Sequence, residues 1–144
     1  VDFPLTNQDL YNIAAMVYGK AGSEDINHWQ MAASAFFNRL GQREWASLSP
    51  VEVLERGFYA VSNKNDPYSW AISKKFPNKQ EEDRFKEVFA LVNAMVRGKK
   101  EILPNQFFFT KKEINSLKRK KKFDFNQVEP VGKIGKYHLF KYKE

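Results

Sequence analysis

The sequence contains no cysteine and only two histidines, His28 and His138, among its 144 residues. The lack of cysteine excludes disulfide bridges, thiolate catalysis and zinc sites with sulfur ligands. Two histidines are too few for a histidine-rich metal site. The apolar runs are only a few residues long, far short of the roughly 20 residues that a membrane-spanning helix needs. We therefore expect no metal site and no transmembrane segment.

The residues that are present predict one folded domain over residues 1–144. This length is usual for a single domain, and hydrophobic residues make up 42% of the chain, with 13 phenylalanines. Such a composition can form a core. The 24 Lys and Arg residues exceed the 17 Asp and Glu residues, which gives a net charge of +7. This charge favours polyanionic partners such as nucleic acid, anionic lipid headgroups or acidic cell-wall polymers.

The first forty residues have the pattern of two amphipathic helices. Thr6 and Asp9 resemble a capping box, and apolar residues at helical spacing follow them until Gly19, where we expect the first helix to end. Apolar residues recur every three or four positions over residues 29–40, which predicts a second helix. Gly41 is its natural stop.

The middle of the chain predicts a short helix, a loop and a long helix. Ser49-Pro50 is a helix start signal, and Gly57 closes the short helix. Residues 58–77 combine turn formers with aromatic side chains, which predicts a long loop. Residues 79–97 have the clearest helical pattern, and Gly98 follows them.

The last part of the chain predicts a small sheet. Gln106–Thr110 and Gly135–Tyr142 are rich in aromatic residues and partly alternating, as expected of two paired strands. The dense basic run Lys118–Lys122 lies between them, in an expected loop. Helices come first and a sheet last, so we predict an α+β domain, dominated by helices, with a small antiparallel sheet in its C-terminal part.

A family resemblance begins at residues 18–24, which read Tyr-Gly-Lys-Ala-Gly-Ser-Glu, and continues through a helix that ends in Asn38-Arg39. This stretch resembles the opening of the spore-cortex-lytic type of cell wall hydrolase. In that family Tyr-Gly-Glu-Ala-Arg-Gly-Glu precedes an alanine-rich helix ending in Asn-Arg. Residues 58–62 resemble the family's Phe-Ser-Ala-Val-Ser segment, and looser similarities at residues 107–109 and 134–140 extend the resemblance over nearly the whole chain.

The resemblance implies a lysozyme-like domain that cleaves the glycan backbone of peptidoglycan, as a muramidase or a lytic transglycosylase, without a metal or organic cofactor. In a lytic transglycosylase one protonated carboxyl group donates to the glycosidic oxygen, and a sugar hydroxyl attacks in place of water. The usual glycosidase scheme needs two carboxylates. The resemblance also implies a wall-facing protein, whether periplasmic, secreted, or carried by a spore or phage. Residues 1–4 lack the basic and apolar regions of a signal peptide.

Lys20 stands where the family has the glutamate expected to act as the acid. An ammonium group is a much weaker proton donor than a carboxylic acid near neutral pH. Three explanations stay open. Lys20 is an introduced inactivating change, or catalysis has been lost naturally and a non-catalytic glycan-binding domain is left, or Glu24 has taken over the acid role. Glu24 also precedes the second helix, where a carboxylate favours the positive end of the helix dipole.

Five further residues are candidates for binding the sugar. Tyr59, Ser62 and Asn63 occupy positions that line the groove in the family, and aromatic, hydroxyl and amide groups suit sugar rings and their hydroxyls. Phe108 and His138 lie on the two expected strands. Side chains alternate along a strand, so we expect most of the phenylalanines around Phe108 in the core. A lone histidine on an aromatic strand is more often structural than catalytic.

The run Lys118–Lys122 supports a rival function, the binding of nucleic acid through phosphate contacts. No zinc-finger, helix-turn-helix or ribonucleoprotein motif accompanies the run. We therefore expect peptidoglycan glycan strands, and with them anionic wall polymers, as partners ahead of nucleic acid. The sequence leaves open the oligomeric state and the choice between hydrolase and transglycosylase chemistry.

Overall fold

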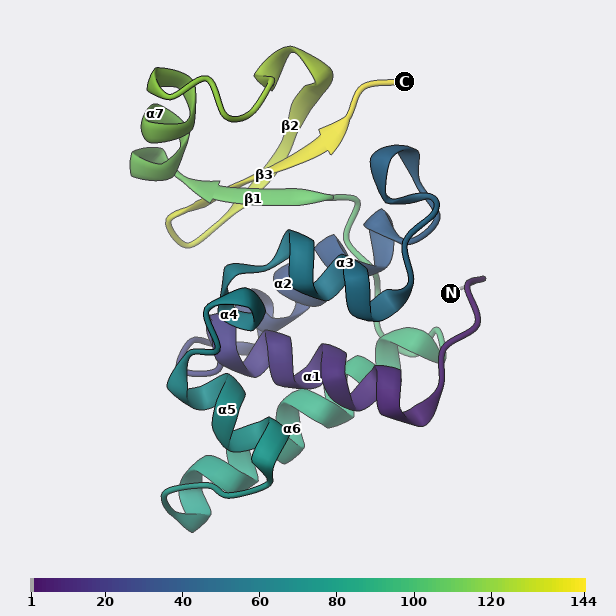
Figure 1. Cartoon of the computed structure of the whole chain (residues 1–144), viewed down its shortest axis with the longest axis vertical. Helices are drawn as coiled ribbons and strands as arrows, with labels where there is room; N and C mark the ends of the chain where they lie inside the picture. The colour runs from purple at the N-terminus through teal and green to yellow at the C-terminus, as the bar shows by residue number, and fades with distance from the viewer. Residues whose placement is uncertain (1) are drawn as a thin grey trace.

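The computed structural model describes residues 2–144. Helices α1 to α6 lie on one side of the molecule and a small sheet with α7 lies on the other (Figure 1). The helical part, residues 2–104, contains α1 (Asn7–Ala21), α2 (Ile26–Arg39), the 3-10 helix η1 (Arg43–Trp45), α3 (Pro50–Gly57), α4 (Tyr59–Ser62), α5 (Asp66–Ser73) and α6 (Lys79–Val96). The sheet part, residues 105–144, contains β1 (Phe107–Thr110), α7 (Lys111–Arg119), η2 (Phe125–Gln127), β2 (Val128–Ile134) and β3 (Tyr137–Tyr142). The predicted helix-dominated α+β class is confirmed. No helix among residues 2–144 has the length and apolar character needed to cross a bilayer.

The first helix begins as predicted and ends later than predicted. Thr6 and Asp9 form a capping box, and α1 continues past Gly19 to Ala21. A Cβ atom on Gly19 would lie 2.9 Å from the Cβ atom of Tyr68 on α5. Gly19 therefore permits close packing between two helices and does not end α1. The other helix ends agree more closely, since α2 ends at Arg39 and Gly41 follows with a φ of 68°.

The prediction of one long loop over residues 58–77 is wrong, because two short helices, α4 and α5, occupy much of it. The turn formers in this segment cap helices. The side chain of Asn65 accepts a hydrogen bond from the amide of Tyr68 and donates one of 2.8 Å to the carbonyl oxygen of Gly19. Asn65 thus begins α5 and also joins it to α1.

The expected loop at Lys118–Lys122 is partly helical, because α7 includes Lys118 and Arg119. The strand β2 was not predicted from the sequence. This strand contains Pro130 and Gly132, residue types that weaken a strand pattern, and its register shifts between these two positions. A bulge of this kind accommodates both residues at the edge of the sheet.

The sheet has the strand order β1-β3-β2, and both pairs are antiparallel. The predicted pairing of the two aromatic strands is confirmed. Phe108 pairs with Leu139, and Phe109 pairs with His138. Because side chains alternate, β1 presents Phe108 and its neighbours to opposite faces of the sheet.

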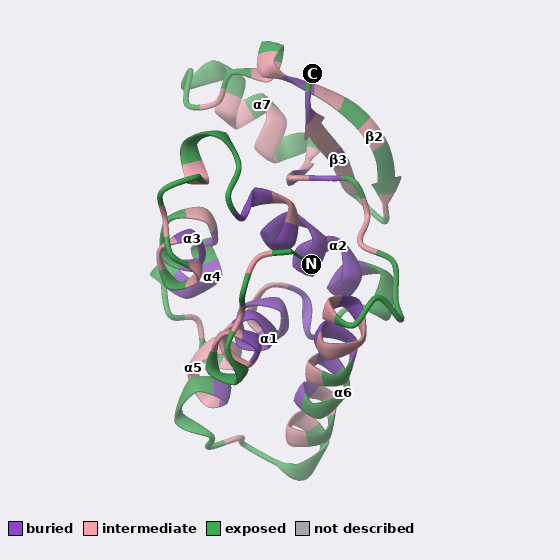
Figure 2. Cartoon of the chain, turned by 90° about the vertical axis from the view of Figure 1, so that its right-hand side faces the viewer, coloured by how far each residue is buried: buried purple, intermediate pink, exposed green. Residues whose placement is uncertain are grey.

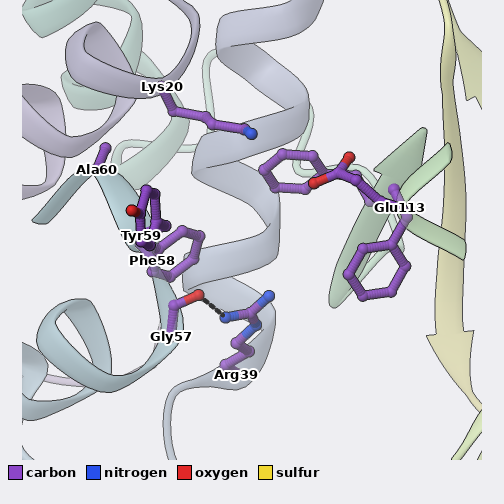
Figure 3. A pocket seen from close by; sticks show the side chains of 9 residues that line it. Lys20, Arg39, Gly57, Phe58, Tyr59, Ala60 and Glu113 are labelled. Atoms are coloured by element: carbon purple, nitrogen blue, oxygen red, sulfur yellow. Dashed lines mark hydrogen bonds between the residues drawn. The ribbon is translucent and has the colours of Figure 1, made fainter. Parts of the chain in front are cut away.

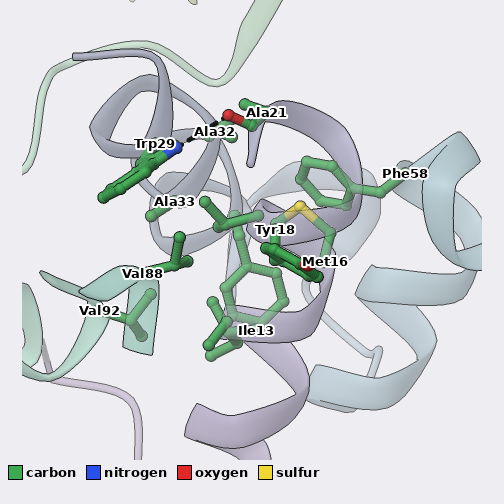
Figure 4. Packing of buried hydrophobic residues seen from close by; sticks show 14 of the residues in the cluster. Ile13, Met16, Tyr18, Ala21, Trp29, Ala32, Ala33, Phe58, Val88 and Val92 are labelled. Carbon is green, nitrogen blue, oxygen red and sulfur yellow. Dashed lines mark hydrogen bonds between the residues drawn. The ribbon is translucent and has the colours of Figure 1, made fainter. Parts of the chain in front are cut away.

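The molecule has two buried clusters, and the larger one includes Phe108 and Leu139 of the sheet part. The main core lies between α1, α2 and α6, where Ile13, Met16 and Val88 are fully buried (Figure 4). Figure 2 shows the same concentration of buried residues along α1 and α2. A smaller cluster lies on the outer face of the sheet and is built around Phe107, Val128 and Tyr142.

Helix α2 fixes the connection into the sheet part. Gln30, Ser34 and Asn38 are spaced by four residues and so share one face of the helix. Gln30 donates a hydrogen bond of 2.7 Å to the carbonyl oxygen of Glu101, and Asn38 donates one of 2.6 Å to that of Leu103. The hydroxyl of Ser34 accepts a 2.9 Å bond from the Leu103 amide. Main-chain atoms of the connection are thus held along the length of α2.

Candidate groove between the two parts

Two adjoining hollows lie between the helical part and the sheet part, and we call them together the groove. The first hollow is lined by Lys20, Arg39, Gly57, Phe58, Tyr59, Ala60, Phe108, Phe109 and Glu113 (Figure 3). The second shares Arg39, Gly57 and Phe109 with the first and adds, among others, Glu44, Arg56 and Lys122. The groove therefore has walls from both parts and several charged groups of both signs.

Lys20 is the penultimate residue of α1, and its side chain extends into the first hollow (Figure 3). Its ammonium nitrogen Nζ lies 5.6 Å from the ring centroid of Phe108 and 5.4 Å from that of Tyr137. Among residues 2–144 no carboxylate oxygen lies within 4.0 Å of this nitrogen. Two aromatic rings, and no ion pair, therefore hold the ammonium group by cation–π attraction.

Glu113 enters the first hollow from the opposite side, in the first turn of α7 (Figure 3). A capping box fixes its side chain. Oε1 of Glu113 accepts a 2.9 Å hydrogen bond from the Thr110 amide, and the Glu113 amide donates one of 3.2 Å to the Thr110 hydroxyl. Glu113 is not among the residues predicted from the sequence. The capping-box pattern at Thr110 was a visible signal, but it does not tell which wall of a groove the helix forms.

Arg39 forms the floor of the groove, and only 5% of it is exposed. Its Nε donates a 2.8 Å hydrogen bond to the carbonyl oxygen of Gln106, and Nη1 donates one of 3.0 Å to that of Gly57. Its guanidinium carbon lies between 4.4 and 5.0 Å from the ring centroids of Phe58, Phe107 and Trp45. Burial lowers the pKa of Arg39 to about 10, so the group stays charged at neutral pH. Arg39 therefore joins α2, the end of α3 and the start of β1.

A glycine is needed beside Arg39. A Cβ atom on Gly57 would lie 2.5 Å from Nη1 of Arg39, closer than non-bonded atoms approach. The absence of a side chain at Gly57 lets the guanidinium reach the Gly57 carbonyl oxygen. From the sequence, Gly57 was predicted only to end a helix.

The structure brings together three of the residues selected from the sequence. Lys20, Tyr59 and Phe108 come from distant segments and all line the first hollow. Tyr59 is 77% exposed, so its ring is open to a ligand. Phe108 is buried, and its ring belongs to the main core as well as to the wall of the groove.

Four other selected residues do not line the groove. Glu24 is exposed in the connection between α1 and α2, and the residue that caps α2 is Asp25. Glu24 therefore does not cap α2, and its helix-dipole role stays a prediction. Ser62 and Asn63 are exposed at the end of α4, and the hydroxyl of Ser62 donates to the carbonyl oxygen of Tyr59 over 3.3 Å. His138 is half-buried on β3.

The start of α2 has its own small network. Nδ1 of His28 lies 2.7 Å from the Asp25 carboxylate, which lowers the pKa of Asp25. The His28 ring also packs edge-on against Tyr137, with 5.9 Å between ring centroids. His28 thus connects the start of α2 to the β2–β3 hairpin and does not line the groove.

The described residues contain no group of three or more His, Asp and Glu side chains arranged to hold a metal ion. The first hollow offers a ligand two cations, a carboxylate and aromatic faces. No protein-family model, curated protein or solved structure matches the chain. The resemblance to the spore-cortex-lytic hydrolases therefore stays a prediction.

Proposed function

We propose that the groove binds a glycan strand of peptidoglycan, and that the chain is a hydrolase-type domain with Lys20 at the position of the catalytic acid. One observation carries this proposal. Lys20, Tyr59 and Phe108, selected from three separate segments of the sequence, line the same hollow. Exposed and partly exposed aromatic faces next to polar groups are the surfaces that sugar rings bind.

The surroundings of position 20 suit an acid better than a base. A carboxyl group there would lie near the Phe108 and Tyr137 rings, which face Lys20 in the present chain. Aromatic surroundings disfavour the charged form of a carboxyl group, and a raised pKa is what a general acid needs near neutral pH. An ammonium group in the same place cannot protonate a glycosidic oxygen efficiently. We therefore expect the chain with Lys20 to bind the glycan without cleaving it.

Glu113 supports this proposal more directly than Glu24 does. Glu113 lies across the first hollow from Lys20, whereas Glu24 is exposed outside it. With a glutamate at position 20, Glu113 would supply the second carboxyl group that the usual glycosidase scheme requires. With Lys20 in place, Glu113 has no acid partner in the lining of the first hollow.

The decisive variant is Lys20→Glu, assayed by the release of soluble fragments from purified peptidoglycan sacculi. We expect release by this variant and none by the original chain. Lys20→Gln is the matched control, because it removes the positive charge without adding an acid. If Lys20→Glu sediments with sacculi but releases no fragments, the proposed catalytic role of position 20 is excluded. Only the proposed binding of the glycan then stands. The terminal sugar of the released fragments, anhydro or reducing, distinguishes a transglycosylase from a hydrolase.

Binding itself is tested with Tyr59→Ala. The ring is exposed, so its loss should leave stability within about 0.5 kcal/mol of the original, while sedimentation with sacculi falls by about tenfold. Ile72→Ala is the control, since Ile72 is also exposed, at 43%, and does not line the groove. Equal retention of the Tyr59 and Ile72 variants would contradict a glycan site at the groove. Failure of the original chain to sediment at all would contradict the proposed function.

A further inference from the structure

The sheet part carries the entire net charge of the protein. Residues 105–144 contain eleven of the 24 Lys and Arg residues but only four of the 17 Asp and Glu residues, which leaves +7. Residues 2–104 contain thirteen residues of each sign. About a quarter of the chain is therefore strongly cationic, and the remainder is neutral. A distribution this uneven produces a local potential that net charge alone does not reveal.

The basic run, Lys118–Lys122, is the densest section of this charge, and all five of its residues are exposed. In the sheet part of the described chain the only ion pair joins Lys141 to Glu129. The helix dipole favours Lys118 and Arg119 at the end of α7, but the run continues for three residues beyond that helix. Neither ion pairs with neighbouring carboxylates nor the helix dipole therefore offsets the positive charge of the whole basic run.

The backbone of the basic run is fixed. The amide of Lys121 donates a 3.2 Å hydrogen bond to the carbonyl oxygen of Lys118, and the amide of Lys122 donates one of 3.1 Å to that of Leu117. Lys121 takes the left-handed conformation, with a φ of 52°, that such a helix end requires. A ligand would thus meet five cationic side chains that project from an ordered backbone.

The basic run is also continuous with the groove. Lys122 lines the second hollow together with Arg39 and Arg56. Lys118 and Lys121 border a neighbouring hollow beside Phe125, and Nζ of Lys118 lies 5.4 Å from the Phe125 ring centroid. Cationic side chains therefore extend from the groove over the surface at the end of α7.

We propose that the basic run binds a phosphodiester-linked anionic polymer of the cell wall while the groove holds the glycan strand, a role that rests on the proposed function. Repeated phosphates match a row of ammonium groups, which act as point charges, and binding gains from the release of counterions. Surfaces that bind nucleic acid strands add exposed aromatic rings on which bases stack. In the described residues of the sheet part no large aromatic ring is exposed, so a polymer without bases fits this surface better.

The test compares two variants with the same loss of charge. In the first, Lys118, Arg119, Lys120, Lys121 and Lys122 are all changed to Gln. In the control, Lys75, Lys86, Arg97, Lys99 and Lys100, exposed residues of the helical part, are changed in the same way. The probe is purified poly(glycerol phosphate). We expect the first variant to lose affinity by tenfold or more. The slope of its log affinity against log salt concentration should be shallower by about 3. The affinity of the control should stay within about twofold of the original.

Equal losses in the two variants would overturn the assignment of the basic run. Tighter binding to single-stranded DNA than to poly(glycerol phosphate) would overturn the choice of a wall polymer. A second measurement separates this inference from the proposed function. Sacculi stripped of phosphodiester polymers by hydrofluoric acid retain the glycan alone. Binding to stripped sacculi without binding to poly(glycerol phosphate) would refute the basic-run site and leave the glycan site standing, and the reverse result would refute the glycan site.

Discussion

The helical part and the sheet part differ in both charge and core. The helical part balances its charges and contains most of the main core, around α1, α2 and α6. The sheet part has the whole net charge and a small cluster of aromatic rings on its outer face. This difference indicates a division of roles, in which the helical part provides most of the stability and the sheet part provides charge and the second wall of the groove.

The largest loss of stability should come from Arg39→Leu, which removes contacts that join the two parts. The change removes hydrogen bonds to the carbonyl oxygens of Gly57 and Gln106. Each orphaned buried acceptor costs about 1–3 kcal/mol, so we expect the free energy of unfolding to fall by about 3 kcal/mol. Denaturant unfolding measures this loss.

Hydrogen exchange sharpens the same experiment. If Arg39 joins the two parts, the amides of β1 and β3 should lose protection in the Leu variant before those of α1 do. Arg39→Lys is the control, because it keeps a charge but cannot reproduce the two-carbonyl geometry, and it should behave like the Leu variant. Equal loss of protection in both parts would mean that they unfold as one unit.

A smaller loss of stability is expected from Tyr142→Phe, because the Tyr142 hydroxyl joins β3 to η1 of the helical part. The Tyr142 hydroxyl donates to Glu44 and accepts a 3.0 Å hydrogen bond from Nε1 of Trp45. Removing a buried hydroxyl bonded to a charged group should cost about 2 kcal/mol near neutral pH. Unfolding followed by tryptophan fluorescence measures this cost.

Alkaline titration gives Tyr142 a distinct signature. Burial, with the Glu44 hydrogen bond, raises the pKa of Tyr142 to about 12 from an ordinary value of 10.0. The folded state therefore holds this proton more tightly than the unfolded state, so the stabilisation is complete below pH 10 and is lost as the pH rises to about 12. The stability of the Phe variant should fall less steeply over that range. Parallel curves for the two proteins would contradict the shift.

The smallest expected effects come from two matched capping boxes, one in each part. Thr6→Ala and Thr110→Ala each remove a helix N-cap and should each cost about 1 kcal/mol. Only the Thr110 variant weakens a helix start that carries a groove residue, because it removes the hydroxyl that accepts from the Glu113 amide. In the Lys20→Glu background it should lower the cleavage of sacculi, and the Thr6 change should not. Equal activity of the two variants would mean that the Thr110 hydroxyl is not needed to position Glu113 for cleavage.

The sequence predicted those elements of the fold that have strong periodicity or clear caps. Thr6 and Ser49 marked the starts of α1 and α3, and the two aromatic strands were recognised by composition. The two short helices were missed because residues such as Asn65 occur in turns as well as at helix caps. The strand β2 was missed because Pro130 and Gly132 break its pattern.

Fewer residues of the candidate site than elements of the fold could be predicted from the sequence. Lys20 and Tyr59 were selected through the family resemblance, and both line the groove. Arg39 was noted only as part of a motif, because its burial depends on Gly57 and on three rings from distant segments. Glu113 was missed for a similar reason. Its capping pattern predicts a helix start, but the position of that helix across from Lys20 follows only from the pairing of β1 with β3.

The anchoring of α2 at both ends has a mechanical consequence for ligand entry. The helix is tied to the sheet part by His28 against the hairpin at one end and by Arg39 at the other, with Asn38 bonded to the main chain of the connection. These contacts at both ends of α2 oppose a hinge motion of the sheet part. The groove is thus preformed, so a ligand meets walls already at their final separation and little main chain has to be ordered on binding.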